Sequence, residues 1–293
     1  MATAAQWIQG ARLRTLPAAI APVLIGTAAA YELDSFRPVN AVLAALVALL
    51  LQIGVNYAND YSDGVRGTDE DRVGPLRLVG SGAAQPEHVK YAAFGAFAVA
   101  MLFGLALVVI TQSWWLILVG VGCVMAAWGY TGGKNPYGYM GLGDVFVFVF
   151  FGLVATLGTT YTQAGQVNLP AVIGAIGTGL IACALLMANN VRDIPTDIQA
   201  GKKTLAVRLG DKHARESYVL MLAVAILLVV ILAPGRPWML IVLLLIPACL
   251  MPAWLMINGR KRKSLIPVLQ QTGLINLGYS LLFSLGLLLS HGF

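Results

Sequence analysis

The chain has 293 residues, of which 58% are hydrophobic and only 11% are charged. Soluble domains carry about 25% charged residues, so this composition excludes a water-soluble protein and predicts a helical integral membrane protein. The net charge of +6 does not indicate a nucleic-acid partner, because membrane proteins concentrate Lys and Arg on the cytoplasmic side.

Nine apolar stretches predict membrane-spanning helices, each of which needs about 20 mostly apolar residues. In chain order they cover residues 16–31, 39–59, 89–111, 114–130, 142–162, 169–190, 217–233, 238–257 and 266–290. Polar residues, Gly and Pro separate the stretches, as is typical of loops. We therefore predict an all-α polytopic membrane protein with a single domain over residues 1–293.

The positions of the charges support nine spans. With this number, 17 of the 19 Lys and Arg residues fall on the side of the N-terminus, and only Arg37 and Arg236 fall on the other side. The positive-inside rule then predicts a cytoplasmic N-terminus and an external C-terminus.

Acidic residues concentrate in two segments on the predicted cytoplasmic side, after the second and sixth spans. We predict two catalytic loops there, at about residues 59–88 and 191–216. The first segment contains Asn56, Asn59, Asp60 and Asp63, followed by Asp69, and the second contains Asn189, Asn190, Asp193 and Asp197.

The spacing within each segment places several oxygen-bearing side chains on one helix face. Carboxylates are disfavoured at helix C-termini, where the macrodipole is negative, and they also repel one another. A divalent cation removes this conflict, and Mg²⁺ prefers oxygen ligands together with waters and substrate phosphates. We therefore predict a Mg²⁺ site that clamps a diphosphate, with ligands Asn56, Asp60, Asp63, Asn189, Asp193 and Asp197.

Other interpretations of these acidic segments are solvated loops, a CDP-alcohol phosphotransferase and a cation-coupled transporter. Asp60-x-x-Asp63-Gly64 matches part of the phosphotransferase pattern, but Val65-Arg66 replaces the Ala-Arg pair that leads to its remaining aspartates. Transporter sites lie near the membrane midplane, whereas these acids follow the cytoplasmic ends of their spans. The phosphotransferase and the transporter therefore fit less well than a diphosphate site.

The two motifs resemble those of the UbiA-type intramembrane aromatic prenyltransferases. The matching residues are Asn59-Asp60-x-x-Asp63, Asp193-x-x-x-Asp197 and Tyr130-x-x-x-Lys134. The resemblance implies nine helices around a central cavity that is open to lipid, and Mg²⁺-dependent transfer of a prenyl group. It also implies catalytic roles for Asp60, Asp63, Asp193, Asp197, Lys134 and Tyr130.

Within the family, the segments at 12–17, 74–82 and 130–144 most resemble the branch that prenylates 1,4-dihydroxy-2-naphthoate in menaquinone synthesis. This implies polyprenyl diphosphate and 1,4-dihydroxy-2-naphthoate as substrates, loss of CO₂ and diphosphate, and a bacterial cell membrane as the location. Acceptors such as 4-hydroxybenzoate or homogentisate are the alternatives. One departure is that Gly67 stands four residues after Asp63, so the next acid is Asp69.

The resemblance also suggests groups that contact the substrates. Lys134 is expected to bind diphosphate, Arg14 to face the naphthoate carboxylate, and Asp144 to orient Lys134 or act as a base. Further candidates are Asn59, Asn190, Arg77 and Lys202. The basic residues among them are also explained as anchors on the cytoplasmic side.

Overall fold

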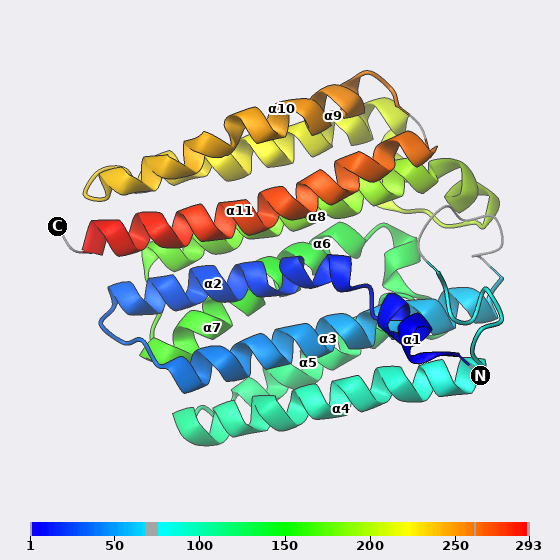
Figure 1. The fold of residues 1–293 in the computed structure, drawn as a ribbon, viewed down its shortest axis with the longest axis horizontal. Coiled ribbons are helices and arrows are strands. Elements are labelled where there is room, and N and C mark those ends of the chain that lie inside the picture. Colours follow the sequence, from blue (N-terminus) through cyan, green and yellow to red (C-terminus); the bar gives the residue numbers. More distant parts are fainter. Residues whose placement is uncertain (1, 68–75, 261, 292–293) are drawn as a thin grey trace.

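The computed structural model describes residues 2–67, 76–260 and 262–291. Asp69 lies outside these residues. All regular structure in the described residues is helical, which confirms the predicted all-α class. The long helices run side by side in a bundle (Figure 1).

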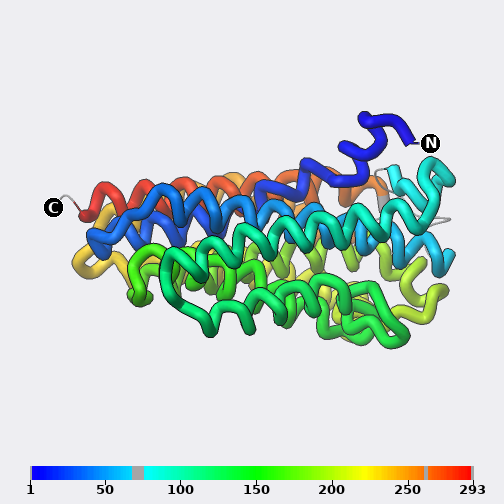
Figure 2. Tube along the Cα trace, turned by 90° about the horizontal axis from the view of Figure 1, so that it is seen from below, coloured from blue at the N-terminus to red at the C-terminus, as the bar shows by residue number. Residues whose placement is uncertain are grey.

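The first half of the chain begins with a short helix and continues with four longer ones. These are α1 (Ala4–Gly10), the 3₁₀ turn η1 (Leu13–Thr15), α2 (Leu16–Glu32), α3 (Pro38–Val65), α4 (Pro86–Thr111) and α5 (Leu116–Gly129). In the view turned by 90°, α1 projects from one side of the bundle (Figure 2).

The second half contains one interrupted helix and four further long segments. They are η2 (Tyr137–Met140), α6 (Gly143–Val147), the π-helix η3 (Phe148–Val154), α7 (Ala155–Ala164), α8 (Leu169–Gln199), α9 (Leu205–Leu227), η4 (Leu228–Leu232), η5 (Pro237–Leu245), α10 (Ile246–Ile257), η6 (Arg262–Leu265) and α11 (Ile266–His291).

Eight helical segments of the described chain are long and apolar enough to cross a membrane, and α5 is a shorter apolar helix. Together they account for the nine predicted spans. With 14 residues, α5 extends about 21 Å, less than the roughly 30 Å hydrocarbon layer. Helix α1 lies at one end of the bundle, and the C-terminal end of α11 lies at the opposite end (Figure 1).

Both acidic motifs lie in helices rather than in the predicted loops. Helix α3 continues to Val65 and α8 continues to Gln199. Residues from Leu205 onward are also helical, with non-helical backbone at Gly210. The predicted loops at 59–88 and 191–216 were therefore too long, because the polar ends of these helices extend beyond their apolar stretches.

The span that contains α6, η3 and α7 has a π-helical centre. Gly152 in this segment lies directly against α8, where an added Cβ would be 2.7 Å from the Cα of Gly179. The close approach explains why glycine occupies both positions. π-Helical turns often occur at functional sites, and here the segment presents Phe150 to an internal cavity.

Candidate active site

A cavity of about 1970 Å³ lies within the bundle, between helices that include α2, α3, α5, α8 and α11. One end of its wall is polar, where Asp63, Asp193 and Lys202 contribute. Farther along, the wall is mainly apolar and includes Val47 and Leu107. The cavity can therefore accept a molecule with a charged head and a long apolar tail.

Asp60, a predicted Mg²⁺ ligand, is fully buried and is not among the residues that line the cavity. Its Oδ2 accepts a hydrogen bond from the backbone N–H of Leu78 at 2.7 Å, and its Oδ1 accepts one from Val79 at 3.1 Å. Asp60 therefore attaches the segment around Leu78 to α3. The preceding residue, Asn59, does line the cavity, and its Oδ1 accepts a hydrogen bond from Thr131 at 2.8 Å.

Asp63 is the centre of a charged cluster at the polar end of the cavity. Arg77 Nη2 lies 3.4 Å from Asp63 Oδ2, and Lys202 Nζ lies 3.5 Å from Oδ1. The hydroxyl of Tyr139 donates to Oδ1 at 2.5 Å, and its ring centroid is 4.4 Å from Lys202 Nζ. Thus two of the predicted substrate-binding cations, Arg77 and Lys202, contact Asp63 of the first motif.

The second motif lines the same cavity from α8. The guanidinium of Arg192 holds both oxygens of Asp193, at 2.7 and 2.6 Å, and also donates to Asn189 Oδ1 at 2.8 Å. Asp197 is largely buried in the wall, and its carbonyl accepts the N–H of Lys202 at 2.8 Å. Because Lys202 also pairs with Asp63, it connects the two motifs.

The oxygen-bearing side chains of the site can be compared with the ligands that Mg²⁺ prefers. In the part of the chain that the structure describes, no three His, Cys, Asp or Glu side chains form a ready-made metal site. Mg²⁺, however, is commonly held by one or two carboxylates with waters and substrate phosphates. The cavity offers oxygen donors of this kind on two helices, so the residues fit this ion. They are Asn59, Asp63, Asn189, Asp193 and Asp197.

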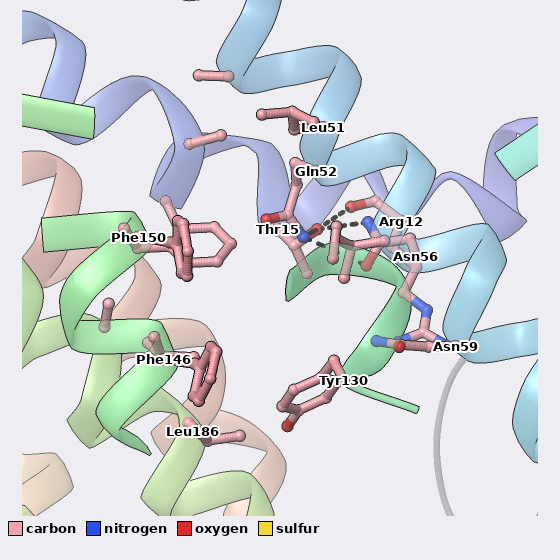
Figure 3. A pocket seen from close by; sticks show the side chains of 18 of the residues that line it. Arg12, Thr15, Leu51, Gln52, Asn56, Asn59, Tyr130, Phe146, Phe150 and Leu186 are labelled. Carbon is pink, nitrogen blue, oxygen red and sulfur yellow. Dashed lines mark hydrogen bonds between the residues drawn. The ribbon is translucent and has the colours of Figure 1, made fainter. Parts of the chain in front are cut away.

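Asn56 has a different environment from the one predicted. Its Nδ2 donates to the carbonyl of Ala11 and to Thr15 Oγ1, both at 2.9 Å. Its Oδ1 accepts from Gln52 Nε2 at 3.3 Å. Asn56 therefore holds the turn between α1 and α2 against α3, and the same turn brings Arg12 into the cavity wall (Figure 3).

Aromatic side chains form one wall next to this turn (Figure 3). The rings of Tyr137 and Phe146 are stacked with centroids 3.8 Å apart, and Phe146 and Phe150 are stacked at 6.0 Å. Tyr130 meets Tyr137 edge-on at 5.6 Å. Burial raises the pKa of the Tyr137 hydroxyl, which stays protonated and donates to Ala126 at 2.6 Å. The wall suits a flat aromatic ligand.

The remaining predicted residues have different positions. Asn190 and Arg14 line the cavity, with Asn190 buried and Arg14 exposed, whereas Lys134 is exposed and lies outside the wall. Asp144 is buried and is not among the residues that line the cavity. Its two carboxylate oxygens have no hydrogen-bond partner among the described residues.

Sequence reasoning did not assign site roles to Arg12, Gln52, Tyr139 and Arg192, although all line the cavity. A usable signal existed for Gln52, which precedes Asn56 by one helical turn inside an apolar stretch. Such an intramembrane polar residue is costly unless it faces a partner or a cavity. The pairing of Arg192 with Asp193 depends on side-chain geometry that no spacing rule reveals.

Comparisons with known proteins agree with this architecture. The model of the UbiA prenyltransferase family matches residues 19–286. The chain is 53% identical to the 1,4-dihydroxy-2-naphthoate octaprenyltransferase of Mycobacterium tuberculosis, over 96% of each chain. It is 38% identical to the Escherichia coli protein of the same name, over 97% of this chain and 96% of that protein.

Solved structures share the fold. A UbiA homolog from Aeropyrum pernix has a TM-score of 0.70 at 15% identity, covering 92% of this chain and 97% of its own. A UbiA homolog from Archaeoglobus fulgidus bound to GPP and Mg²⁺ has a TM-score of 0.67 at 14% identity, covering 98% of this chain and 100% of its own.

Proposed function

Because this chain belongs to the UbiA prenyltransferase family, we propose that it transfers a polyprenyl group from polyprenyl diphosphate to 1,4-dihydroxy-2-naphthoate. The reaction releases CO₂ and diphosphate and gives a demethylmenaquinol, a precursor of menaquinone. The observation that carries this proposal is the 53% identity to a 1,4-dihydroxy-2-naphthoate octaprenyltransferase over 96% of both chains. The amphipathic cavity supports it independently.

The diphosphate is assigned to the polar end of the cavity. Arg77, Lys202 and Arg192 supply positive charge there, and guanidinium groups bind phosphate oxygens with two parallel hydrogen bonds. Asn59, Asp63, Asn189, Asp193 and Asp197 are the proposed Mg²⁺ ligands, in line with the Mg²⁺ bound by the Archaeoglobus homolog. When bound, the ion neutralises charge on the departing diphosphate.

The naphthoate is assigned to the space beside the turn between α1 and α2. There, Tyr130, Phe146 and Phe150 provide aromatic surface, and Arg12 provides a cation for the carboxylate (Figure 3). Arg12 is a better candidate than Arg14, because Arg14 is exposed whereas Arg12 is partly buried. A charge-assisted hydrogen bond is stronger where water is excluded.

The bonds broken and formed in the proposed reaction can be accounted for without a general base. The C–O bond of the polyprenyl diphosphate breaks and its electron pair leaves with diphosphate. The ring carbon that carries the carboxylate attacks the allylic cation. The bond to the carboxylate then breaks as CO₂ leaves, and its electron pair restores the aromatic ring. Since no ring proton is lost, the proposed base role of Asp144 is unnecessary, and the apolar wall protects the cation from water.

The proposed setting is a bacterial cell membrane, with the N-terminal end of the bundle in the cytoplasm. The sequence predicts 17 basic residues on the cytoplasmic side, which supports this orientation. The polyprenyl tail is expected to lie along the apolar part of the cavity, in contact with membrane lipid.

The function can be tested with purified protein in lipid nanodiscs. Polyprenyl diphosphate and Mg²⁺ are supplied with 1,4-dihydroxy-2-naphthoate, 4-hydroxybenzoate or homogentisate, and products are identified by mass spectrometry. We expect a decarboxylated prenyl naphthoquinol from the first acceptor, abolished by EDTA and by Asp63→Asn. Arg12→Gln is expected to raise KM for the naphthoate about tenfold or more. Product formed from 4-hydroxybenzoate alone would contradict the acceptor assignment.

A further inference from the structure

Gln52 is a polar side chain in the cavity wall, one turn before Asn56 on α3. It is only 8% exposed, and its neighbour Leu51 also lines the cavity. A buried amide requires hydrogen-bond partners for both its nitrogen and its oxygen. Its partners therefore determine which end of the amide faces the cavity.

The orientation of the Asn56 amide is fixed first. Its neighbour, the carbonyl of Ala11 at 2.9 Å, can only accept a hydrogen bond, so the NH₂ group of Asn56 must face it. The Oδ1 atom of Asn56 then faces Gln52 at 3.3 Å. This arrangement requires the NH₂ group of Gln52 on that side.

Thr15 fixes the same orientation independently. Its hydroxyl proton is donated to the carbonyl of Arg12 at 2.9 Å. The hydroxyl oxygen can then only accept, and it does so from Asn56 Nδ2 at 2.9 Å and from Gln52 Nε2 at 3.1 Å. With one donated and two accepted bonds, the capacity of this hydroxyl is used completely.

These contacts leave the Gln52 Oε1 atom without a hydrogen-bond partner among the described residues. The network holds the amide nitrogen, and the oxygen points away from the hydrogen bonds, on the side of Phe150 (Figure 3). A fixed hydrogen-bond acceptor therefore lies in the wall of the same cavity as the stacked rings of Phe146 and Phe150.

We propose that Gln52 Oε1 accepts a hydrogen bond from the 4-hydroxyl group of the aromatic acceptor and thereby selects and orients it. This inference rests on the proposed function. The 1-hydroxyl of 1,4-dihydroxy-2-naphthoate lies next to the carboxylate and can donate to it internally, so the 4-hydroxyl has the free proton. A site built to pair with a hydroxyl discriminates against analogues that lack it. Gln52 is thus a positioning residue in the acceptor site.

The test measures binding rather than turnover. Dissociation constants are determined by calorimetry in nanodiscs for 4-hydroxy-2-naphthoate, 4-methoxy-2-naphthoate and 2-naphthoate, without a prenyl substrate. The wild type is expected to bind the hydroxy acid about five- to tenfold more tightly than the other two, as one hydrogen bond provides. The methoxy compound has an oxygen in the same place but no proton to donate.

The variants Gln52→Leu and Gln52→Met are expected to remove this preference, so that each variant binds the hydroxy acid no more tightly than the other two naphthoates. The matched control is Gln270→Leu, because Gln270 lines the cavity from α11 but is exposed. It should keep the preference. The proposal is overturned if the wild type does not prefer the hydroxy acid, or if either folded Gln52 variant keeps the preference.

These outcomes are distinct from failure of the proposed function. If none of the naphthoates binds to the wild type, the assignment of the acceptor class is wrong. If naphthoates bind and are prenylated but the preference does not depend on Gln52, only the present inference is wrong.

Discussion

Substitution of Asp60 is the most direct test of which residues of the first motif stabilise the fold and which bind the metal and diphosphate. Its carboxylate accepts two backbone N–H groups, of Leu78 at 2.7 Å and Val79 at 3.1 Å, and is fully buried. Hydrogen bonds to charged groups contribute about 1.5–3 kcal/mol each. In Asp60→Asn one oxygen remains to accept, while the new NH₂ group faces a donor. We expect this variant to lose about 2 kcal/mol of stability.

In Asp60→Ala both N–H groups lose their partner, and the expected loss is about 4 kcal/mol. The assay is thermal unfolding in detergent without Mg²⁺ or substrate, repeated with Mg²⁺ and an unreactive polyprenyl thiodiphosphate. A ligand that binds only the folded state raises the unfolding midpoint. Asp60→Asn should start from a lower midpoint than the wild type but keep most of the ligand-induced rise.

Asp63→Asn is the matched comparison, because it changes the same chemical group one helical turn away. Asp63 lines the cavity, so this variant should lose the ligand-induced rise. The reasoning is refuted if Asp60→Asn unfolds like the wild type without ligand and shows no rise with it. That result would identify Asp60 as a metal ligand.

Two further predictions concern charge and packing. Lys202→Ala should raise the Kd of the thiodiphosphate, measured by calorimetry, about tenfold. Lys134→Ala should raise this Kd less, because Lys134 is exposed and lies outside the cavity wall. Equal effects of the two substitutions would contradict the assignment of Lys202 to the diphosphate. Gly177→Ala should destabilise the bundle by about 1–3 kcal/mol, because its Cβ would lie 2.0 Å from the Tyr279 hydroxyl. Gly95→Ala, whose Cβ meets open space, is the control in the same unfolding assay, and equal losses would refute the packing argument.

Much of the fold follows from the sequence, because membrane spans require long apolar stretches. The predicted span at 169–190 corresponds to the apolar part of α8. The boundaries were less predictable at the polar ends of α3 and α8. Hydropathy records where a helix leaves the hydrocarbon, not where its backbone hydrogen bonds stop. Helix α8 also continues through Pro195 to Gln199.

The residue types of the candidate site could be predicted from the sequence, but the contacts of each side chain could not. Spacing alone places Asn56, Asp60 and Asp63 on one helix face. The structure separates their roles, because Asn56 contacts the turn between α1 and α2, Asp60 contacts backbone around Leu78, and Asp63 lies in the wall. One helix face can contact three different neighbours, and a single sequence does not specify which neighbour packs at each position along the helix.

The charges around the motifs also bear on how the polar end of the cavity is balanced before substrate arrives. Asp63 pairs with Arg77 and Lys202, and Asp193 pairs with Arg192. A buried carboxylate without such partners is costly. Under the proposed function, diphosphate brings negative charge for these cations, and Mg²⁺ brings positive charge for the carboxylates. Each of these groups can therefore exchange a partner within the protein for one in the substrate complex, so binding leaves none of them unpaired.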